Sequence, residues 1–186
     1  MKTSNRINWL GLMLMTILGF ASCSDEYELP EHNLDIEFRY ELTCSEVFLK
    51  YVTPQVTITD GKGVQQILTI EDNMWTGSGH KTWTQSVHYD SLNVSSTMMV
   101  KYLPKTGVTY QDEQDFDNVH YLSCLILVQE DGYGRRNNYT IIPDFPAKSD
   151  VNASALKTYI ESLGNKTTTR GGSVDLKGEI TKIEND

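Results

Sequence analysis

The stretch LDIEFRYELTC, residues 34–44, decides the fold class of this chain. Every even-numbered position in it carries an apolar or thiol side chain, and every odd-numbered position carries a polar one. This period of two indicates a β-strand with one face buried and the other in solvent. The next apolar residues, Val47, Leu49 and Tyr51, fall on odd numbers, so we expect a bend or bulge near Ser45.

Later segments repeat the strand pattern, separated by turn residues. Alternating stretches on each side of residues 60–63 predict a hairpin over residues 56–70. Residues 121–129 are apolar at both parities, as in a central strand that is covered on two sides. Further strands are predicted over residues 81–89 and 94–102, around 139–142, and in the tail near Val174 and Ile180.

One helix interrupts the strands. Its apolar stripe has helical spacing and comprises Leu156, Tyr159, Ile160 and Leu163. Ser149 or Asp150 is suited to cap its start, and Gly164 to end it. Roughly seven to nine short strands and one short helix near the C-terminus predict a mostly β fold, an antiparallel two-sheet sandwich of immunoglobulin-like type. A closed barrel is the alternative.

The beginning of the chain has the order of a bacterial lipoprotein signal. Two basic residues precede an apolar run over residues 9–20, and small residues followed by Cys23 come next. The run is shorter than the ~20 residues that a membrane-spanning helix needs, so we interpret residues 1–22 as an export signal. Cleavage before Cys23 would leave its thiol to carry acyl chains such as palmitate. The alternative is an ordinary signal peptide, with Cys23 a free thiol.

Residues 23–33 are acidic and lack periodic apolar positions, as expected of a flexible tether. Within them, Ser24, Asp25 and Glu26 resemble the acidic export signal that follows the lipidated cysteine in surface lipoproteins of Bacteroides-like gut bacteria. We expect residues 34–186 to form a single domain, which is long enough to bury a core without metals or multiple disulfides.

The chain is acidic, with a formal net charge of −9 at pH 7. Removal of residues 1–22 would change this to −11, because that segment holds two basic residues and no acidic one. A negative surface repels phosphates, which excludes nucleic acid as an expected partner. The histidines lack metal-ligand spacing and no nucleophile motif is present, so we expect no metal, no cofactor and no catalytic activity.

Two groups of residues leave alternatives open. Cys44 and Cys124 share strand faces with apolar residues, so both should point inward, and a disulfide between the sheets is a candidate. Such a bridge would stabilise the fold by about 4.5 kcal/mol in the chain-entropy model, but two buried free thiols fit equally well. The acidic loop over residues 112–117 could hold calcium, although it lacks the full EF-hand pattern and a solvated loop is favoured.

Exposed aromatic residues are the candidate ligand contacts, because sugars stack on flat rings. Trp75 lies in a polar stretch, and Tyr133 lies in a glycine-flanked turn. The alternative for Trp75 is that its ring folds back to cap the sandwich. Asp90-Ser91-Leu92 resembles the O-glycosylation acceptor of Bacteroides-like bacteria, so Ser91 is a candidate modified residue.

Residues 42–63, together with the lipobox, resemble small uncharacterised lipoproteins of Bacteroides-like gut bacteria. The resemblance implies an envelope address and a sandwich fold, and it carries no functional residue. We therefore expect a lipid-anchored outer-membrane protein, surface-exposed or periplasm-facing, that acts as a binding module for a glycan or for a host or partner protein. The alternative is a structural component of an envelope or pilus-like complex that pairs through a sheet edge. That role predicts an unpaired terminal strand, and the segment after Gly172 is the candidate.

Overall fold

The computed structural model describes residues 33–130, 133–139 and 148–185. The compact unit that contains them spans Asn33–Asp186. The predicted export signal, Cys23 and almost all of the acidic tether therefore lie outside the described residues. Within the described part of the chain, the structure is mostly β, with a single helix longer than two turns.

The strands are β1 (Leu34–Ser45), β2 (Val52–Asp60), β3 (Gln65–Thr69), β4 (His80–Tyr89), β5 (Val94–Pro104), β6 (Glu113–Phe116), β7 (His120–Glu130), β8 (Tyr133–Tyr139), β9 (Ser149–Val151), β10 (Thr168–Val174) and β11 (Ile180–Asn185). The helices are α2 (Glu46–Leu49), the 3-10 helix η1 (Asp72–Met74) and α3 (Ala153–Leu163). None of these described helices is long and apolar enough to cross a membrane.

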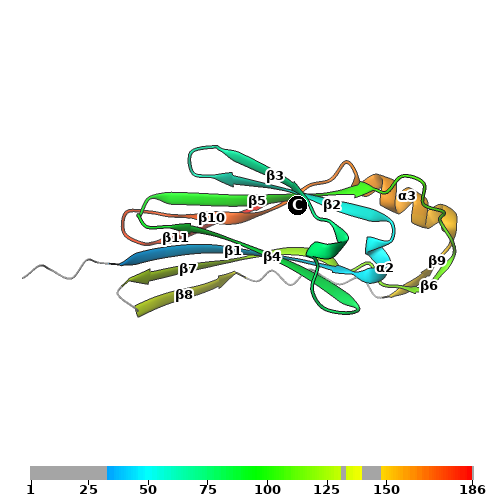
Figure 1. The fold of residues 1–186 in the computed structure, drawn as a ribbon, viewed down its shortest axis with the longest axis horizontal. Coiled ribbons are helices and arrows are strands. Elements are labelled where there is room, and N and C mark those ends of the chain that lie inside the picture. The colour runs from blue at the N-terminus through cyan, green and yellow to red at the C-terminus, as the bar shows by residue number, and fades with distance from the viewer. Residues whose placement is uncertain (1–32, 131–132, 140–147, 186) are drawn as a thin grey trace, which may run out of the picture. The chain divides into compact units, whose positions relative to one another are not determined.

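Two antiparallel sheets form the layers of a sandwich (Figure 1). Sheet A has the order β4-β1-β7-β8, and sheet B has the order β11-β10-β5-β2-β3. A small third sheet pairs β6 with β9 and lies with α3 at one end of the sandwich. The predicted mostly β, antiparallel sandwich is confirmed. Because β1 pairs with β4 and β7, distant parts of the sequence meet in sheet A.

The core lies between the sheets, where the even-numbered side chains of β1 point. Those that are fully buried are Ile36, Phe38, Tyr40, Leu42 and Cys44. The Tyr40 hydroxyl donates a 2.8 Å hydrogen bond to Ser96 Oγ on β5, so the one polar atom of this row has a partner across the core. A buried hydroxyl without such a partner would destabilise the fold.

Helix α3 has the predicted apolar stripe, with Leu156, Ile160 and Leu163 buried. Its cap is Asn152, whose side chain accepts the N–H of Ala155 at 2.9 Å. The prediction that Ser149 or Asp150 caps the helix is wrong, because both belong to β9 and pair with β6.

The expected irregularity near Ser45 is the single helical turn α2. Ser45 Oγ accepts the N–H of Phe48 at 3.1 Å, which caps the turn and directs the Phe48 side chain into the core. Val47 and Leu49 lie within this turn, and β2 again buries even-numbered residues, among them Val56 and Ile58. The predicted strand around 139–142 begins earlier than expected, since β8 starts at Tyr133, which pairs with Glu130.

The tail forms the strands predicted near Val174 and Ile180, and both belong to sheet B. Strand β10 pairs with β5 on one side and with β11 on the other, so the unpaired strand that the assembly alternative requires is not formed by these described residues. A Cβ atom on Gly171 would lie 2.2 Å from the Ser96 carbonyl oxygen and 2.7 Å from Thr97 Cα. Gly171 thus allows β10 to pack closely against β5.

Candidate functional site

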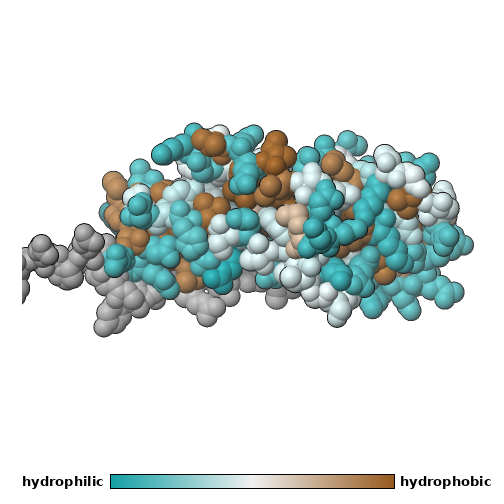
Figure 2. Space-filling view, viewed as in Figure 1, coloured by the Kyte–Doolittle hydropathy of each residue, from teal (hydrophilic) through white to brown (hydrophobic). Residues whose placement is uncertain are grey.

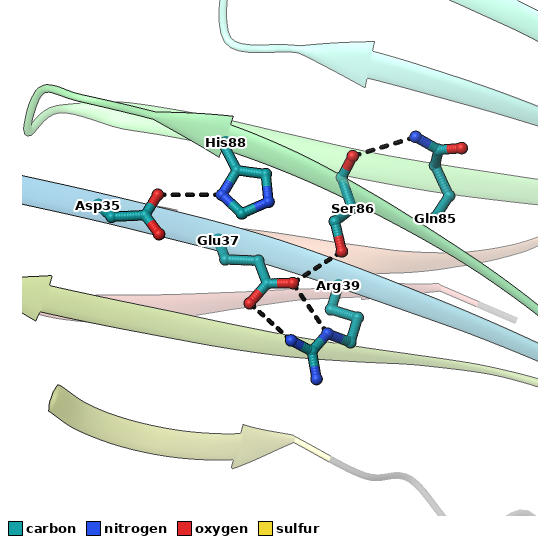
Figure 3. Close-up of polar contacts among 6 residues, drawn as sticks. All are labelled: Asp35, Glu37, Arg39, Gln85, Ser86 and His88. Atoms are coloured by element: carbon teal, nitrogen blue, oxygen red, sulfur yellow. Dashed lines mark hydrogen bonds and ion pairs between the residues drawn. The ribbon is translucent and has the colours of Figure 1, made fainter.

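The outward face of sheet A concentrates charged side chains on two neighbouring strands. In the register of β1 with β4, Glu37 opposes His88 and Arg39 opposes Ser86. Their side chains, together with Asp35, point away from the core because they occupy the opposite parity to the buried residues of β1. We call Asp35, Glu37, Arg39, Ser86 and His88 the charged face; Figure 3 shows them on β1 and β4.

Glu37 is the centre of the charged face, and only 8% of its surface is exposed although it occupies an outward position. Arg39 binds its carboxylate with two parallel hydrogen bonds, Nε to Oε1 at 2.8 Å and Nη2 to Oε2 at 2.9 Å. Ser86 Oγ donates a third, to Oε1 at 2.7 Å. Figure 3 shows the Arg39 and Ser86 side chains converging on the carboxylate. Bidentate pairing of this kind fixes both partners in one orientation.

The environment keeps Glu37 ionised. Burial alone would raise the pKa of this carboxyl, but the hydrogen bonds from Arg39 and Ser86 and the charges of Arg39 and His88 outweigh burial and lower it. An ionised carboxylate so little exposed needs partners that replace water, and Arg39 and Ser86 supply them here. The core does not require one at this outward position, so the pair is a candidate for function.

His88 extends the charged face toward the beginning of β1. Its Nδ1 lies 3.0 Å from Asp35 Oδ1, and both side chains are at least half exposed. The ring is thus both exposed and within hydrogen-bonding distance of a carboxylate. The second ring nitrogen, Nε2, forms no hydrogen bond with any described residue and is available to a ligand.

An apolar strip borders the charged face on β7. The register places Leu127 beside Glu37 and Leu125 beside Arg39. Both leucines are half-buried on the outward face. The sheet therefore presents hydrogen-bonding groups and aliphatic surface next to one another.

The serine and the histidine of the charged face belong to separate contacts. The Ser86 hydroxyl donates to Glu37, whereas His88 lies within hydrogen-bonding distance of Asp35. No hydrogen bond joins Ser86 to His88 among the described residues. The arrangement can bind and orient polar groups.

The acidic loop distributes its carboxylates among separate partners. Asp112 Oδ1 accepts the N–H of Ala153 at the start of α3 (2.8 Å), and Asp117 Oδ2 lies 2.8 Å from His80 Nε2. In the part of the chain that the structure describes, no group of three or more His, Cys, Asp or Glu side chains could hold a metal ion. The calcium alternative has no structural support there.

The predicted ligand contacts are distributed over different parts of the fold. Trp75 is half-buried and packs against the core, which supports the alternative that it caps the sandwich. Tyr133 is the first residue of β8 rather than the tip of a long turn, and its side chain lies outside what is described. Ser91 is exposed in the turn between β4 and β5, where a modifying enzyme could reach it.

Of the two alternatives for the cysteines, the structure shows the free thiols rather than the disulfide. Cys44 and Cys124 are free, buried thiols, and both lie in sheet A. In the β1–β7 register Cys44 opposes His120, whereas Cys124 opposes Tyr40. This offset of four residues corresponds to ~13 Å, well beyond the ~7 Å between Cα atoms that a disulfide tolerates. Burial raises the pKa of both thiols, that of Cys124 to about 12, which makes them poor nucleophiles.

Sequence reasoning missed the charged face, although one signal was present. Glu37 and Arg39 have opposite charges two residues apart on a strand, so they share a face and can pair. The contributions of Ser86 and His88 depend on the pairing of β4 with β1, which the sequence pattern did not reveal.

Comparisons with known proteins provide no relative from which a function could be transferred. No protein-family model, no curated protein and no solved structure matches this chain. The charged face of sheet A and the neighbouring apolar strip are therefore the basis on which a function can be argued.

Proposed function

We propose that this domain is a non-catalytic binding module that holds a neutral glycan on the charged face of sheet A. The Glu37–Arg39 pair carries the proposal, because it places an ionised, nearly buried carboxylate and a fixed guanidinium at outward positions. Sugar hydroxyls both donate and accept hydrogen bonds. Glu37 fixes the Arg39 guanidinium, which is 47% exposed and can donate its remaining N–H groups to a sugar oxygen.

The charge balance favours a neutral ligand over an anionic one. Arg39 is already matched by Glu37, and His88 is paired with Asp35. The chain as a whole is negative, which repels anionic polymers. Leu125 and Leu127 offer aliphatic surface for the C–H face of a sugar ring. The polar side chains already hold one another in place. Binding would therefore order few of them and lose little conformational entropy.

The proposal also includes a lipid anchor at Cys23. Acylation of Cys23 would attach the domain to the outer membrane, with the acidic residues that follow as a tether. Protease treatment of intact cells should remove the domain if it is displayed on the surface, and a lysed sample should be cleaved in either case. Release of a Cys23→Ala chain from the membrane fraction would support the lipid anchor. Full protection on intact cells would contradict surface display and indicate a periplasmic location.

Affinity electrophoresis of the full chain in detergent tests the ligand class. Native gels would contain dextran, mannan, arabinogalactan, mucin or, as an anionic comparison, chondroitin sulfate. A neutral polymer should retard the wild-type chain, and Arg39→Ala should abolish the retardation. Lys101→Ala is the matched control, since it removes a cation from the outward face of sheet B. Equal retardation of both variants, retardation by the anionic polymer alone, or no retardation at all would contradict the proposal.

The alternative role, a component of a pilus-like complex, predicted a feature that the described residues do not have. It required an unpaired terminal strand after Gly172, and β11 is paired along its length with β10. The binding-module proposal needs no free strand, and so we favour it.

A further inference from the structure

The two main sheets end in four edge strands, and one of them lacks the usual protection against pairing. Natural edges are shielded by charged side chains, prolines or bulges. Strands β4, β8 and β11 carry such charges, at Lys81, Arg135, Arg136, Lys182 and Glu184. Strand β3, with the sequence QQILT, carries neither a charge nor a proline. It is the edge of sheet B that lies next to β2.

The hairpin that ends in β3 also exposes large apolar side chains. Val64 is 64% exposed and Ile67 is 61% exposed. Figure 2 shows brown, hydrophobic surface in the region where Figure 1 draws β3. Exposed apolar side chains on an uncharged edge favour pairing with another strand.

The hydrogen-bond pattern shows which groups of β3 point outward. The bonds that flank it join Asp60 N–H to the Val64 carbonyl (3.1 Å) and Ile70 N–H to the Pro54 carbonyl (2.9 Å). The even-numbered residues of β3 therefore form backbone hydrogen bonds with β2. The N–H and C=O groups of its odd-numbered residues face away from β2. The outward groups belong to Gln65, Ile67 and Thr69.

We propose that β3 pairs with β3 of a second copy of this chain, antiparallel about a twofold axis at Ile67. In this register Ile67 opposes its own counterpart, and Gln65 opposes Thr69 of the other copy. Each opposed pair would exchange its outward N–H and C=O groups. The contact is isologous, and it joins two B sheets into one continuous sheet.

The charges at the ends of the hairpin are complementary in this arrangement. Lys62 is exposed before β3, and Glu71 and Asp72 are exposed after it. Antiparallel pairing brings Lys62 of one copy alongside the acidic pair of the other, and the twofold axis repeats the contact. Asp72 lies 3.9 Å from Lys105 within its own chain, an exposed contact that leaves the carboxylate accessible. On a chain with net charge −9, an edge of this kind reduces the repulsion between copies.

Cysteine cross-linking of the full chain in cell envelopes tests the register. In a hydrogen-bonded antiparallel pair, opposed Cα atoms lie ~5.5 Å apart, which a disulfide can bridge. With diamide as oxidant, Ile67→Cys should form a disulfide-linked dimer on a non-reducing gel. Thr69→Cys, on the same strand, would lie ~13 Å from its counterpart and should form several-fold less. Thr181→Cys on β11 is the edge control, and the wild-type chain controls for Cys23.

Charge reversal identifies the occupant of the edge. In the Ile67→Cys chain, Lys62→Glu should reduce the dimer several-fold, and adding Asp72→Lys should restore it. Restoration occurs only if Lys62 and Asp72 of two identical chains meet. Circular dichroism of each purified variant verifies that it folds. An Ile67→Cys dimer no stronger than that of Thr181→Cys, a failure of the double reversal to restore it, or a cross-link to a protein of different mass would overturn the proposal.

Discussion

The outward faces of the two sheets are built from different chemistry. Sheet A carries the charged face, with four ionisable side chains on β1 and β4. The outward positions of β2, β5 and β10 in sheet B are mostly neutral and comprise Thr53, Gln55, Thr57, Thr59, Ser95, Thr97, Met99, Lys101, Leu103, Thr169, Gly171 and Ser173. Lys101 is the one charge among these described positions.

Solubility does not explain the difference between the two outward faces. Either face would be soluble, because hydroxyl and amide groups hydrate well. A nearly buried Glu37 held by Arg39 adds nothing to solubility, since it is withdrawn from water. The contrast teaches that sheet B depends on the close packing of its backbones, whereas sheet A fixes polar side chains through hydrogen bonds on its outward face.

The largest effect should come from a change in the backbone packing of sheet B. Gly171→Ala would place a Cβ atom 2.2 Å from the Ser96 carbonyl oxygen, so we expect a loss of about 3 kcal/mol or more in the free energy of unfolding. Ser173→Ala in the same strand should change it by less than about 0.5 kcal/mol. Urea denaturation followed by circular dichroism measures both. Equal urea midpoints for the two variants would disprove the packing account.

The next effect should distinguish the two outward cations. Arg39→Ala leaves the nearly buried Glu37 with Ser86 as its remaining partner, so we expect a loss of about 1–2 kcal/mol, moderated because Arg39 is 47% exposed. Lys101→Ala should cost less than about 0.5 kcal/mol. The same urea titration compares them. If Lys101→Ala is as destabilising as Arg39→Ala, the faces do not differ in the way that we describe.

The pH dependence of stability should reveal the ionised Glu37. Burial opposes its ionisation, but the hydrogen bonds and charges of Arg39, Ser86 and His88 outweigh burial, so the folded-state pKa lies below the ordinary value of 4.5. Its contribution is therefore present above pH 4.5 and is lost as the pH falls through the lower folded-state value. Glu37→Gln should be less stable than wild type at neutral pH, and the gap should narrow in acid. A gap that widens in acid would contradict this sign.

The smallest effect should come from the two histidine pairs at opposite ends of β4. His88 pairs with Asp35 and His80 with Asp117, and both rings are more than half exposed. Replacing either histidine with alanine should therefore lower stability by less than about 1 kcal/mol. Glycan binding should distinguish the two variants, because His88 lies on the charged face and His80 does not. Equal loss of glycan retardation in both variants would show that His88 has no particular role.

The individual strands and the hairpin of β2 with β3 were accessible from the sequence, and the pairing of distant strands was not. The alternation over residues 34–44 predicted β1, and the stripe around Leu156 and Ile160 predicted α3, because periodicity reports which side of an element is buried. The charged face needs contacts between residues about fifty positions apart, such as Ser86 with Glu37. Local patterns predict neighbours within a hairpin, such as β2 and β3, but not the pairing of strands that are distant in the sequence.

Two local patterns were ambiguous for a common physical reason. Gly171 and Gly172 precede the segment that the assembly alternative takes as an unpaired strand, yet glycine also allows strands to pack closely, and the structure uses this property. The apolar residues on odd numbers after Ser45 suggested a bend or bulge; Val47 and Leu49 lie in the helical turn α2, and β2 again buries even-numbered residues. In both cases one residue pattern is compatible with two backbone geometries, and tertiary contacts select between them.

Hydrogen–deuterium exchange of the full chain tests the central claim most directly, because it locates the ligand without any substitution. The chain would be compared with and without the neutral polysaccharide that retards it most strongly. We predict slower exchange in β4, an edge strand of sheet A, around Ser86 and His88, with no change in β3 or β11. Slower exchange confined to strands of sheet B would contradict the assignment of the charged face as the binding surface.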